Sequence, residues 1–252
     1  MKSILALALA LLAPTAASAE PLTIAAGKPT GGYDTAAQRL SQRLSQRSID
    51  STIKNFAGSD EITLALCANK ADIGFTQIDA IYTRVIEGCT LQPLGLYGRE
   101  YAYIFFPDNS PYNELEDLDA STTVLIDTLG SGTDLFWNTI RDIELGDQGN
   151  GSDWASASSI HAPIDLAPTL AEIGDIDAVI LVRKPDDRDI RNLLALGFTT
   201  GWLYDKDIND VAFNDRSLYE SVDGQTYEVR SFVVAGPSFD KSLTRTVQVS
   251  IK

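Results

Sequence analysis

The sequence predicts an α/β protein built as two lobes, each a mostly parallel sheet flanked by helices. Between residues 22 and 106, short apolar strand candidates alternate with amphipathic helix candidates. Alternation of this kind is typical of parallel sheets that are covered by helices on both faces. A polar segment at residues 110–118 interrupts the pattern, which restarts near residue 122. The length of 252 residues allows one large or two modest domains, enough for a real hydrophobic core.

These observations predict where the lobes begin and end. The expected order is lobe one at residues 20–106, a crossover or hinge at 107–121, lobe two at 122–215, and a return segment to lobe one at 216–252.

Residue spacing predicts the elements of the first lobe. Ala37, Leu40 and Leu44 recur at steps of three and four, and Asp34 can cap the helix that they indicate. A second helix opens at Ser59, because a serine caps a helix well and two acids that favour its positive end follow. The expected strands are 22–26, 52–55, 71–75, 91–96 and 101–106, and the other expected helices are 34–47 and 78–87.

The second lobe repeats the same alternation. A tight loop at residues 130–133 connects its first strand to its first helix, and an exposed loop is expected at 148–152. The expected strands are 122–126, 177–182 and 226–235, and the expected helices are 134–144, 164–173 and 186–194.

Residues 1–19 have the form of a secretory signal that is cleaved after Ala19. A basic start at Lys2 precedes residues 4–12, which are only Ile, Leu and Ala, and Ala17-Ser18-Ala19 has the small-x-small form of a signal peptidase site. The apolar run is far shorter than the roughly 20 residues that a membrane span requires. We therefore expect an exported protein that is not inserted in the membrane; the periplasm as its location is implied by the resemblance given below.

Charge and residue counts exclude several classes of function. The chain has 35 acidic and 20 basic residues, a formal net charge of −15, which argues against nucleic-acid binding because that needs a basic face. His161 is the only histidine, so multi-histidine metal sites are excluded. Asp205, Asp207 and Asp210 come closest to a calcium loop but miss its regular alternation of acids. We expect neither a metal nor a cofactor.

Cys67 and Cys89 are the only cysteines in the chain. Export to an oxidising compartment favours a disulfide between them, worth roughly 3 kcal/mol in the chain-entropy model. The alternative is two buried free thiols, because the sequence does not reveal their geometry.

Two glycine-rich loops, one in each lobe, are candidate anion-binding sites. Residues 130–133 (Gly-Ser-Gly-Thr) lie between a strand and a helix, where backbone N–H groups, hydroxyls and the helix dipole can meet a carboxylate or phosphate oxygen. The loop at residues 27–33 has the same setting, with Lys28 and Thr30 as donors and Tyr33 as a wall. Both loops would face a cleft between the lobes. The alternative for each is a plain turn before a helix.

Catalytic chemistry is poorly supported by the sequence. The loop at 130–133 is not a dinucleotide fingerprint, because Leu135 stands at the third glycine position. It is not a nucleophile elbow either, because Leu129 stands where that motif needs glycine. A Ser-His-Asp site would have to use His161, and one histidine among many serines and acids matches a triad by chance. We interpret His161 as a solvent-exposed loop residue and do not expect an enzyme.

Five segments match the pattern of one known family. They are the loop after the first strand, residues 58–61, residues 71–82, residues 130–133 and Asp177-Ala178. Together they resemble the TAXI family of solute-binding proteins, the extracytoplasmic receptors of TRAP transporters. The similarity runs from about residue 22 to residue 182, and residues 71–82 are its most specific part. It implies a two-lobed periplasmic binding protein type 2 fold with a hinge and a closing cleft. Compared with the family pattern, this chain is divergent and short at the C-terminus.

The resemblance also implies which residues meet the ligand. They are Gly31 and Tyr33 in the first loop, Ser59, Gln77 and Asp79 in lobe one, and Ser131, Gly132 and Thr133 in lobe two. Two departures from the family pattern place cations beside the cleft, Lys28-Pro29 in the first loop and Arg183-Lys184 after the Asp-Ala strand. Lys28 or Arg183 is therefore expected to pair with a ligand carboxylate.

The resemblance implies a transport function. A monomer would capture a small organic anion, such as an amino acid, a dicarboxylate or a keto acid, and deliver it to the membrane permease subunits of a TRAP transporter. One alternative is a periplasmic sensor or scaffold with the same fold, which hands its bound state to a signalling partner. The other is a secreted serine hydrolase that uses Ser131 or another serine together with His161.

Overall fold

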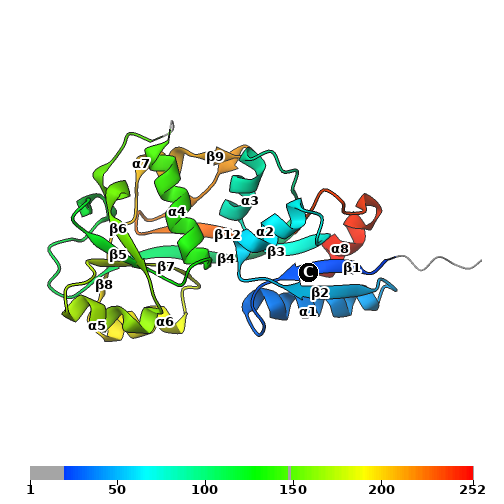
Figure 1. The fold of residues 1–252 in the computed structure, drawn as a ribbon, viewed down its shortest axis with the longest axis horizontal. Helices are drawn as coiled ribbons and strands as arrows, with labels where there is room; N and C mark the ends of the chain where they lie inside the picture. Colours follow the sequence, from blue (N-terminus) through cyan, green and yellow to red (C-terminus); the bar gives the residue numbers. More distant parts are fainter. Residues whose placement is uncertain (1–19, 147–148, 252) are drawn as a thin grey trace, which may run out of the picture.

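A ten-stranded mixed sheet extends through the whole molecule (Figure 1). The computed structural model describes residues 20–146 and 149–251, so the predicted signal segment at 1–19 lies outside the described residues. The strand order is β2-β1-β3-β12-β4-β7-β5-β6, with β11 on β12 and β8 on β4. No helix in residues 20–146 and 149–251 is both long and apolar enough to cross a membrane.

The elements have the following bounds. The main strands are β1 (Leu22–Ala26), β2 (Ser51–Asn55), β3 (Ile73–Gln77), β4 (Gln92–Phe106), β5 (Thr123–Ile126), β6 (Ser158–His161), β7 (Ala178–Arg183) and β12 (Thr226–Ala235). The main helices are α1 (Gly32–Ser45), α2 (Ser59–Cys67), α3 (Ile78–Ile86), α4 (Gly132–Leu145), α5 (Ala167–Glu172), α6 (Arg188–Ala195) and α8 (Thr244–Ile251). Shorter elements are η1 (Leu115–Asp117), η2 (Asp153–Ser156), η3 (Ile164–Leu166), β8 (Thr199–Thr200), α7 (Lys206–Asp210), β9 (Ala212–Phe213), β10 (Arg216–Ser217), β11 (Glu220–Val222) and η4 (Lys241–Leu243).

Two parallel parts of the sheet are joined by two long antiparallel strands. β1 pairs in parallel with β2 and β3, and β5 pairs in parallel with β6 and β7. We call these groups, with their helices, the first and the second half. β4 pairs antiparallel with β12 along its first residues and with β7 along its last, so β4 and β12 run between the halves (Figure 1). This architecture confirms the predicted fold class, whereas the residue limits of the lobes stay a prediction.

The prediction of two separate strands at residues 91–96 and 101–106 is wrong. β4 is one strand of 15 residues. Gly98, Arg99 and Glu100 break the apolar run in the sequence, but β12 pairs continuously alongside them and takes up two register shifts. Pairing with a long neighbour therefore overrides the local pattern here.

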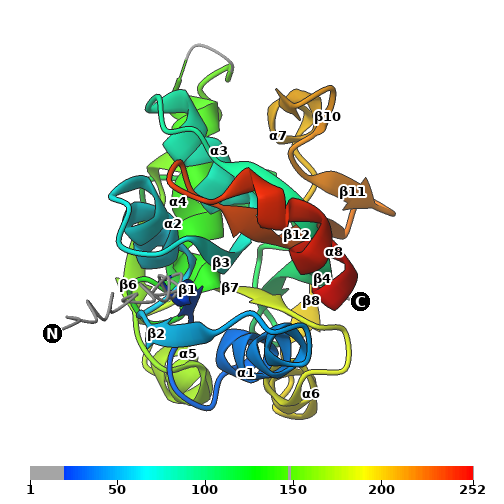
Figure 2. The ribbon, with the colours of Figure 1, turned by 90° about the vertical axis from the view of Figure 1, so that its right-hand side faces the viewer.

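Helices cover both faces of the sheet in each half. In the first half, α1 and α8 pack on one face, and α2 and α3 lie on the opposite face (Figure 2). In the second half, α4 lies on the same face as α2 and α3, whereas α5 and α6 cover the other face. Strand β7 shows why this works, because Ile180 packs towards α4 while Val179 and Leu181 pack towards α5 and α6.

The apolar core on the α4 side is continuous between the halves. Ile62 of α2 and Ile81 of α3 belong to the same buried cluster as Phe136 of α4. Phe136 also packs edge to face against Tyr219, with ring centroids 5.0 Å apart. This shared core sets the amino-terminal end of α4 close to the first half.

Cys67 and Cys89 form a disulfide, as predicted, with their Cα atoms 5.9 Å apart. The bond ties the last residue of α2 to the segment that leads into β4.

Candidate ligand-binding cleft

A cavity of about 440 Å³ lies between the two halves. Its size is in the range of small-molecule sites in proteins. The loops that follow β1, β2 and β5 contribute most of its walls, together with the last residues of β3 and β7. A ligand site at the carboxyl ends of parallel strands is the usual place in open α/β sheets. The lining residues are Gly27, Lys28, Gly31, Gly32, Tyr33, Ala57, Gly58, Ser59, Gln77, Glu100, Asp127, Thr128, Gly130, Ser131, Gly132, Val182 and Arg183.

Four helices begin at this cavity. The residues that precede α1, α2, α3 and α4 are Gly31, Gly58, Gln77 and Ser131, and all four line it. The first N–H groups of a helix have no partner within the helix, and the helix dipole places partial positive charge there. Three of these helices belong to the first half and one to the second, so both walls can attract an anionic group.

The loops before α1 and α4 are built in the same way. Thr30 and Gly130 both have left-handed backbone conformations, with φ of 66° and 75°. Their N–H groups donate to the carboxylates of Asp34 and Asp134, at 2.9 and 2.8 Å. Each acid lies in the first turn of its helix and fixes the loop in front of it.

A side chain from the edge strand supports each of these acids. Asn55, the last residue of β2, donates its Nδ2 to Asp34 at 2.8 Å. His161, the last residue of β6, contacts Asp134 through Nε2 at 2.8 Å. The prediction that His161 lies in a loop is wrong, because His161 ends an edge strand that pairs with β5. The polar neighbours of His161 do not show this strand in the sequence. Its ring contacts an acid and, among the described residues, hydrogen-bonds no serine, so the hydrolase alternative gains no support.

The two walls of the cavity touch. A Cβ atom placed on Gly58 would lie 2.2 Å from the carbonyl oxygen of Gly130 in the opposite half. A Cβ atom placed on Gly132 would lie 2.5 Å from Nε2 of Gln77. Glycine at both positions permits this approach, which any side chain would obstruct. The structure therefore has its halves closed against each other at the cavity.

Two lining acids, Glu100 and Asp127, were not identified from the sequence. Nε2 of Gln77 donates to Oε2 of Glu100 at 3.5 Å. Burial raises the pKa of Glu100, although Arg183 and Lys184 oppose this shift. Glu100 escaped notice because it lies where we divided β4 into two strands. Asp127 directly follows β5 at the carboxyl end of a predicted strand, a position that could have revealed it.

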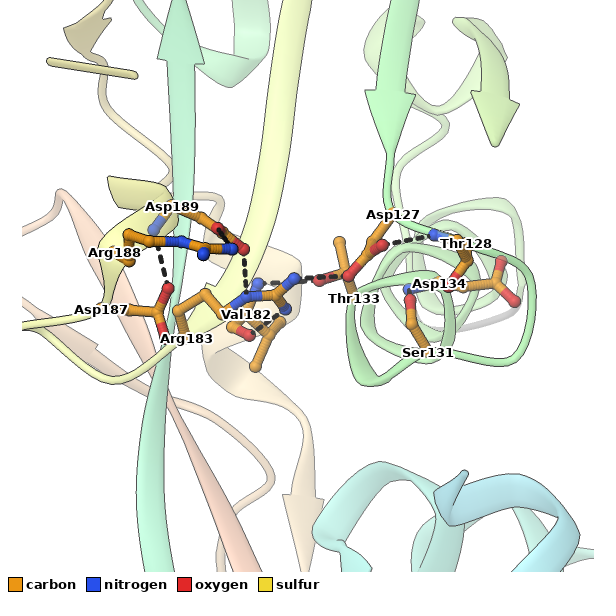
Figure 3. A network of polar contacts seen from close by, with 10 residues as sticks. All are labelled: Asp127, Thr128, Ser131, Thr133, Asp134, Val182, Arg183, Asp187, Arg188 and Asp189. Atoms are coloured by element: carbon orange, nitrogen blue, oxygen red, sulfur yellow. Dashed lines mark hydrogen bonds and ion pairs between the residues drawn. The ribbon is translucent and has the colours of Figure 1, made fainter. Parts of the chain in front are cut away.

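Arg183 is held between two carboxylates (Figure 3). Its Nη2 lies 2.5 Å from Oδ2 of Asp127, and its Nε lies 3.2 Å from Oδ2 of Asp189. Burial would lower the pKa of Arg183, but these two acids outweigh it and raise that pKa. A ligand carboxylate could reach Arg183 only by sharing it with Asp127. Lys28, by contrast, is an exposed lining residue.

The cavity brings together most of the residues that we predicted as ligand contacts. These are Lys28, Gly31, Tyr33, Ser59, Gln77, Ser131, Gly132 and Arg183. Thr30, Asp79 and Thr133 do not line it. The Thr133 hydroxyl accepts the Val182 N–H at 3.0 Å (Figure 3), and Thr30 is an exposed residue of the first loop. The ligand contacts themselves stay a prediction.

Asp79 is fully buried next to the cleft. It accepts a hydrogen bond from the Tyr219 hydroxyl at 3.1 Å and another from the Ala80 N–H at 2.9 Å. Burial raises the pKa of Asp79 to about 7, because these hydrogen bonds only partly replace water around the carboxylate. Asp79 therefore acts on the packing of α3 and Tyr219 and not on the cavity directly.

Comparison with known proteins identifies the fold but no sequence family. No protein-family model and no curated protein matches the chain. The structure of XAC2383 from Xanthomonas citri bound to ATP aligns with a TM-score of 0.60 and 13% identity, covering 92% of this chain and 82% of that one. The periplasmic aliphatic sulphonate binding protein SsuA from Escherichia coli aligns with a TM-score of 0.54 and 19% identity, covering 93% and 72%. The GluR0 ligand binding core in complex with L-glutamate gives 0.54 and 14%, covering 93% and 91%. The chain thus has the two-lobed fold of periplasmic binding proteins, as predicted.

Proposed function

We propose that this protein is an extracytoplasmic solute-binding protein that captures a small organic acid in the cleft between its halves. The observation that carries the proposal is the meeting of four helix N-termini, from both halves, at one cavity. A carboxylate placed there would receive N–H groups from both walls and would hold them together. The ligand would then favour the closed state by contacts that an open state lacks.

The charges of the cavity favour an amino acid over a dicarboxylate or keto acid. Glu100 is a half-buried lining carboxylate without an ion-pair partner among the described residues, and Asp127 is paired with Arg183. An amino acid carries a carboxylate for the helix N-termini and an ammonium group for Glu100. A dicarboxylate would bring its second negative charge towards Glu100 and Asp127, which is unfavourable at short range. The neighbour with L-glutamate bound is consistent with this choice.

The transport partner rests on the sequence resemblance. Residues 58–61, 71–82 and 130–133 resemble the TAXI family, and we infer from this that the ligand passes to the permease subunits of a TRAP transporter. We infer likewise that residues 1–19 direct the chain to the periplasm and that it acts there as a monomer.

A ligand screen tests this function. Thermal unfolding of the protein would be followed with amino acids, dicarboxylates and keto acids, and the best ligands would be titrated by calorimetry. A ligand at a hundred times its Kd stabilises the protein by about 2.7 kcal/mol, which raises the melting temperature by roughly 5–10 °C in a chain of this size. We expect this response with at least one amino acid. A flat response to all three classes would contradict the proposal.

A further inference from the structure

A cluster of carboxylates lies at the carboxyl-terminal end of α4, the end opposite the cleft. Glu144 comes from α4, and Asp205 and Asp207 come from the start of α7. One carboxylate oxygen of each residue lies within 4.8 Å of the corresponding oxygens of the other two. The helices α4 and α7 are far apart in sequence, so only the fold assembles this group.

Two of the three residues are buried, and the cluster is incompletely paired. Glu144 is 1% exposed and Asp205 is 2% exposed. Oε2 of Glu144 and Oδ2 of Asp207 are buried and have no hydrogen-bond partner among the residues that the structure describes. A buried carboxylate oxygen without a partner is unfavourable, and an unpaired buried oxygen in a native protein commonly marks an ion or a water.

The other oxygens of the cluster are fixed by hydrogen bonds. Oε1 of Glu144 accepts the Ser152 N–H, at 2.5 Å. Oδ2 of Asp205 accepts the indole N–H of Trp154 at 3.1 Å, and its Oδ1 accepts the Asp207 N–H at 2.8 Å. These contacts orient Glu144 and Asp205 before any ligand arrives, which is how protein metal sites hold their ligands.

Within the described part of the chain, no basic side chain pairs with the cluster. None of the ion pairs within residues 20–146 and 149–251 involves Glu144, Asp205 or Asp207. The nearby Lys206 pairs instead with Asp210, at 3.0 Å. Glu116 adds a further carboxylate in contact with Asp205.

We propose that Glu144, Asp205 and Asp207 bind a divalent hard cation, and that the cation is Ca²⁺. Carboxylate oxygens are the ligands that Ca²⁺ and Mg²⁺ prefer, whereas zinc and copper sites in proteins draw on nitrogen or sulfur. Ca²⁺ lies about 2.3–2.6 Å from its oxygen ligands, so two ligands of one ion are at most about 5 Å apart. The separations in the cluster satisfy this limit. Water can complete the coordination.

The cation would have a structural role in the second half. It would connect the end of α4 to α7 and to the segment at Ser152. Without a cation, the carboxylates of α4 and α7 bring like charges together. The site is independent of the ligand proposed for the cleft, so the two proposals can fail separately.

The test uses Ca²⁺ and Mg²⁺ as probes with the protein freed of metal by a chelator. Equilibrium dialysis measures the number of ions bound, and thermal unfolding measures the stabilisation. The variants are Glu144→Gln and Asp207→Asn, and the control is Asp142→Asn, which removes the same charge from an exposed position on the same helix. The protein should bind one Ca²⁺ per chain and melt roughly 5–10 °C higher at a hundred times the Kd.

The variants separate a metal site from a mere cluster of acids. Glu144→Gln and Asp207→Asn should weaken Ca²⁺ binding at least tenfold, while Asp142→Asn binds like the wild type. In chelator, Glu144→Gln should be at least as stable as the wild type, because it removes an uncompensated buried charge, so its loss of binding would not reflect misfolding. Absence of saturable Ca²⁺ and Mg²⁺ binding by the wild type, or equal Ca²⁺ binding by Glu144→Gln, would overturn the proposal.

Discussion

The two halves of the molecule share one backbone arrangement but carry different side chains. In the first half, the Thr23 N–H donates to Asp72 at 2.7 Å, and in the second half the Thr123 N–H donates to Asp177 at 2.8 Å. Each of these acids stands just before the third parallel strand of its half. The same correspondence holds for the loops before α1 and α4, whose N–H groups bind an acid in the first helical turn.

The side chains at the cleft differ between the halves. β3 ends in the neutral Gln77, whereas β7 ends in Arg183, which is paired with Asp127 and Asp189. The supporting residue at the edge strand is Asn55 in the first half and His161 in the second. The shared backbone arrangement places helix N-termini on both walls, and under the proposed function the unequal side chains would give an asymmetric ligand one preferred orientation.

The largest expected effect concerns the contact between the halves. Gly58→Ala would place a Cβ atom 2.2 Å from the backbone oxygen of Gly130, which cannot rotate away. The backbone at Gly58 is extended, with φ of −177°, so alanine fits there locally. We expect ligand affinity to fall at least a hundredfold, about 2.8 kcal/mol, with little change in melting temperature.

The control for this variant is Gly98→Ala on β4, where an added Cβ meets no atom within 4 Å. Gly132→Ala should have an intermediate effect, because its Cβ meets the flexible end of Gln77 and not backbone. Calorimetric titration of the three variants with one ligand measures the order. Unchanged affinity in Gly58→Ala would refute closure at this contact.

Glu100 adds to this asymmetry, because it lies on β4 between the halves and forms no ion pair with the described residues. Glu100→Gln should weaken amino-acid binding by about tenfold to a hundredfold, or 1.4–2.8 kcal/mol, by removing the charge that faces the ammonium group. Binding of a dicarboxylate to the same variant serves as the internal control and should be unchanged or stronger. Equal losses for both ligand classes would show that Glu100 does not select an ammonium group.

Asp79 has no counterpart in the second half, where Lys184 and Pro185 follow β7. Its folded-state pKa of about 7 lies above the ordinary value of 3.8, so the folded protein binds more protons than the unfolded chain between these pH values. The contribution of the protonated Asp79 carboxyl to the free energy of unfolding is fully present below about pH 4 and is lost as the pH rises through 7.

Asp79→Asn removes this titration. As the pH rises from 5 to 8, the wild type should lose on the order of 2 kcal/mol of stability that the variant keeps. Urea unfolding of both proteins at the two pH values measures the difference. A wild-type stability that falls no more steeply than that of Asp79→Asn would contradict the raised pKa.

His161 and Asn55 test whether the edge-strand supports are equivalent. His161→Ala removes a partner of the buried Asp134 and should lower the free energy of unfolding by about 1 kcal/mol, because the imidazole is partly exposed. His161→Asn should recover most of this loss, since Asn55 shows that an amide can fill the role. Urea unfolding compares the three proteins, and a His161→Asn variant as unstable as His161→Ala would break the correspondence.

The sequence revealed the features that depend on neighbouring residues. The glycine loops, the helix starts at Ser59 and Gly132 and the buried strands follow from local spacing, and they lie close to the predicted places. Features made by pairing across the fold were missed. β6 is a polar edge strand that only β5 defines, and Glu100 reaches the cleft only because β4 is continuous.

The acidic cluster illustrates the same limit. Asp205, Asp207 and Asp210 are close in sequence, so spacing groups them together. In the structure Asp210 pairs with Lys206, and the third carboxylate beside Asp205 and Asp207 is that of Glu144 from another helix. No spacing rule connects a residue of α4 with the start of α7, so this group could only be found in three dimensions.

A crystal structure of the protein with its best amino-acid ligand tests the central claim most directly. We predict that the ligand occupies the cavity between the halves, with its carboxylate within hydrogen-bond distance of N–H groups at the starts of helices from both halves. Its ammonium group should lie against Glu100. A ligand bound at another surface, or bound to one half alone with the halves apart, would contradict the account.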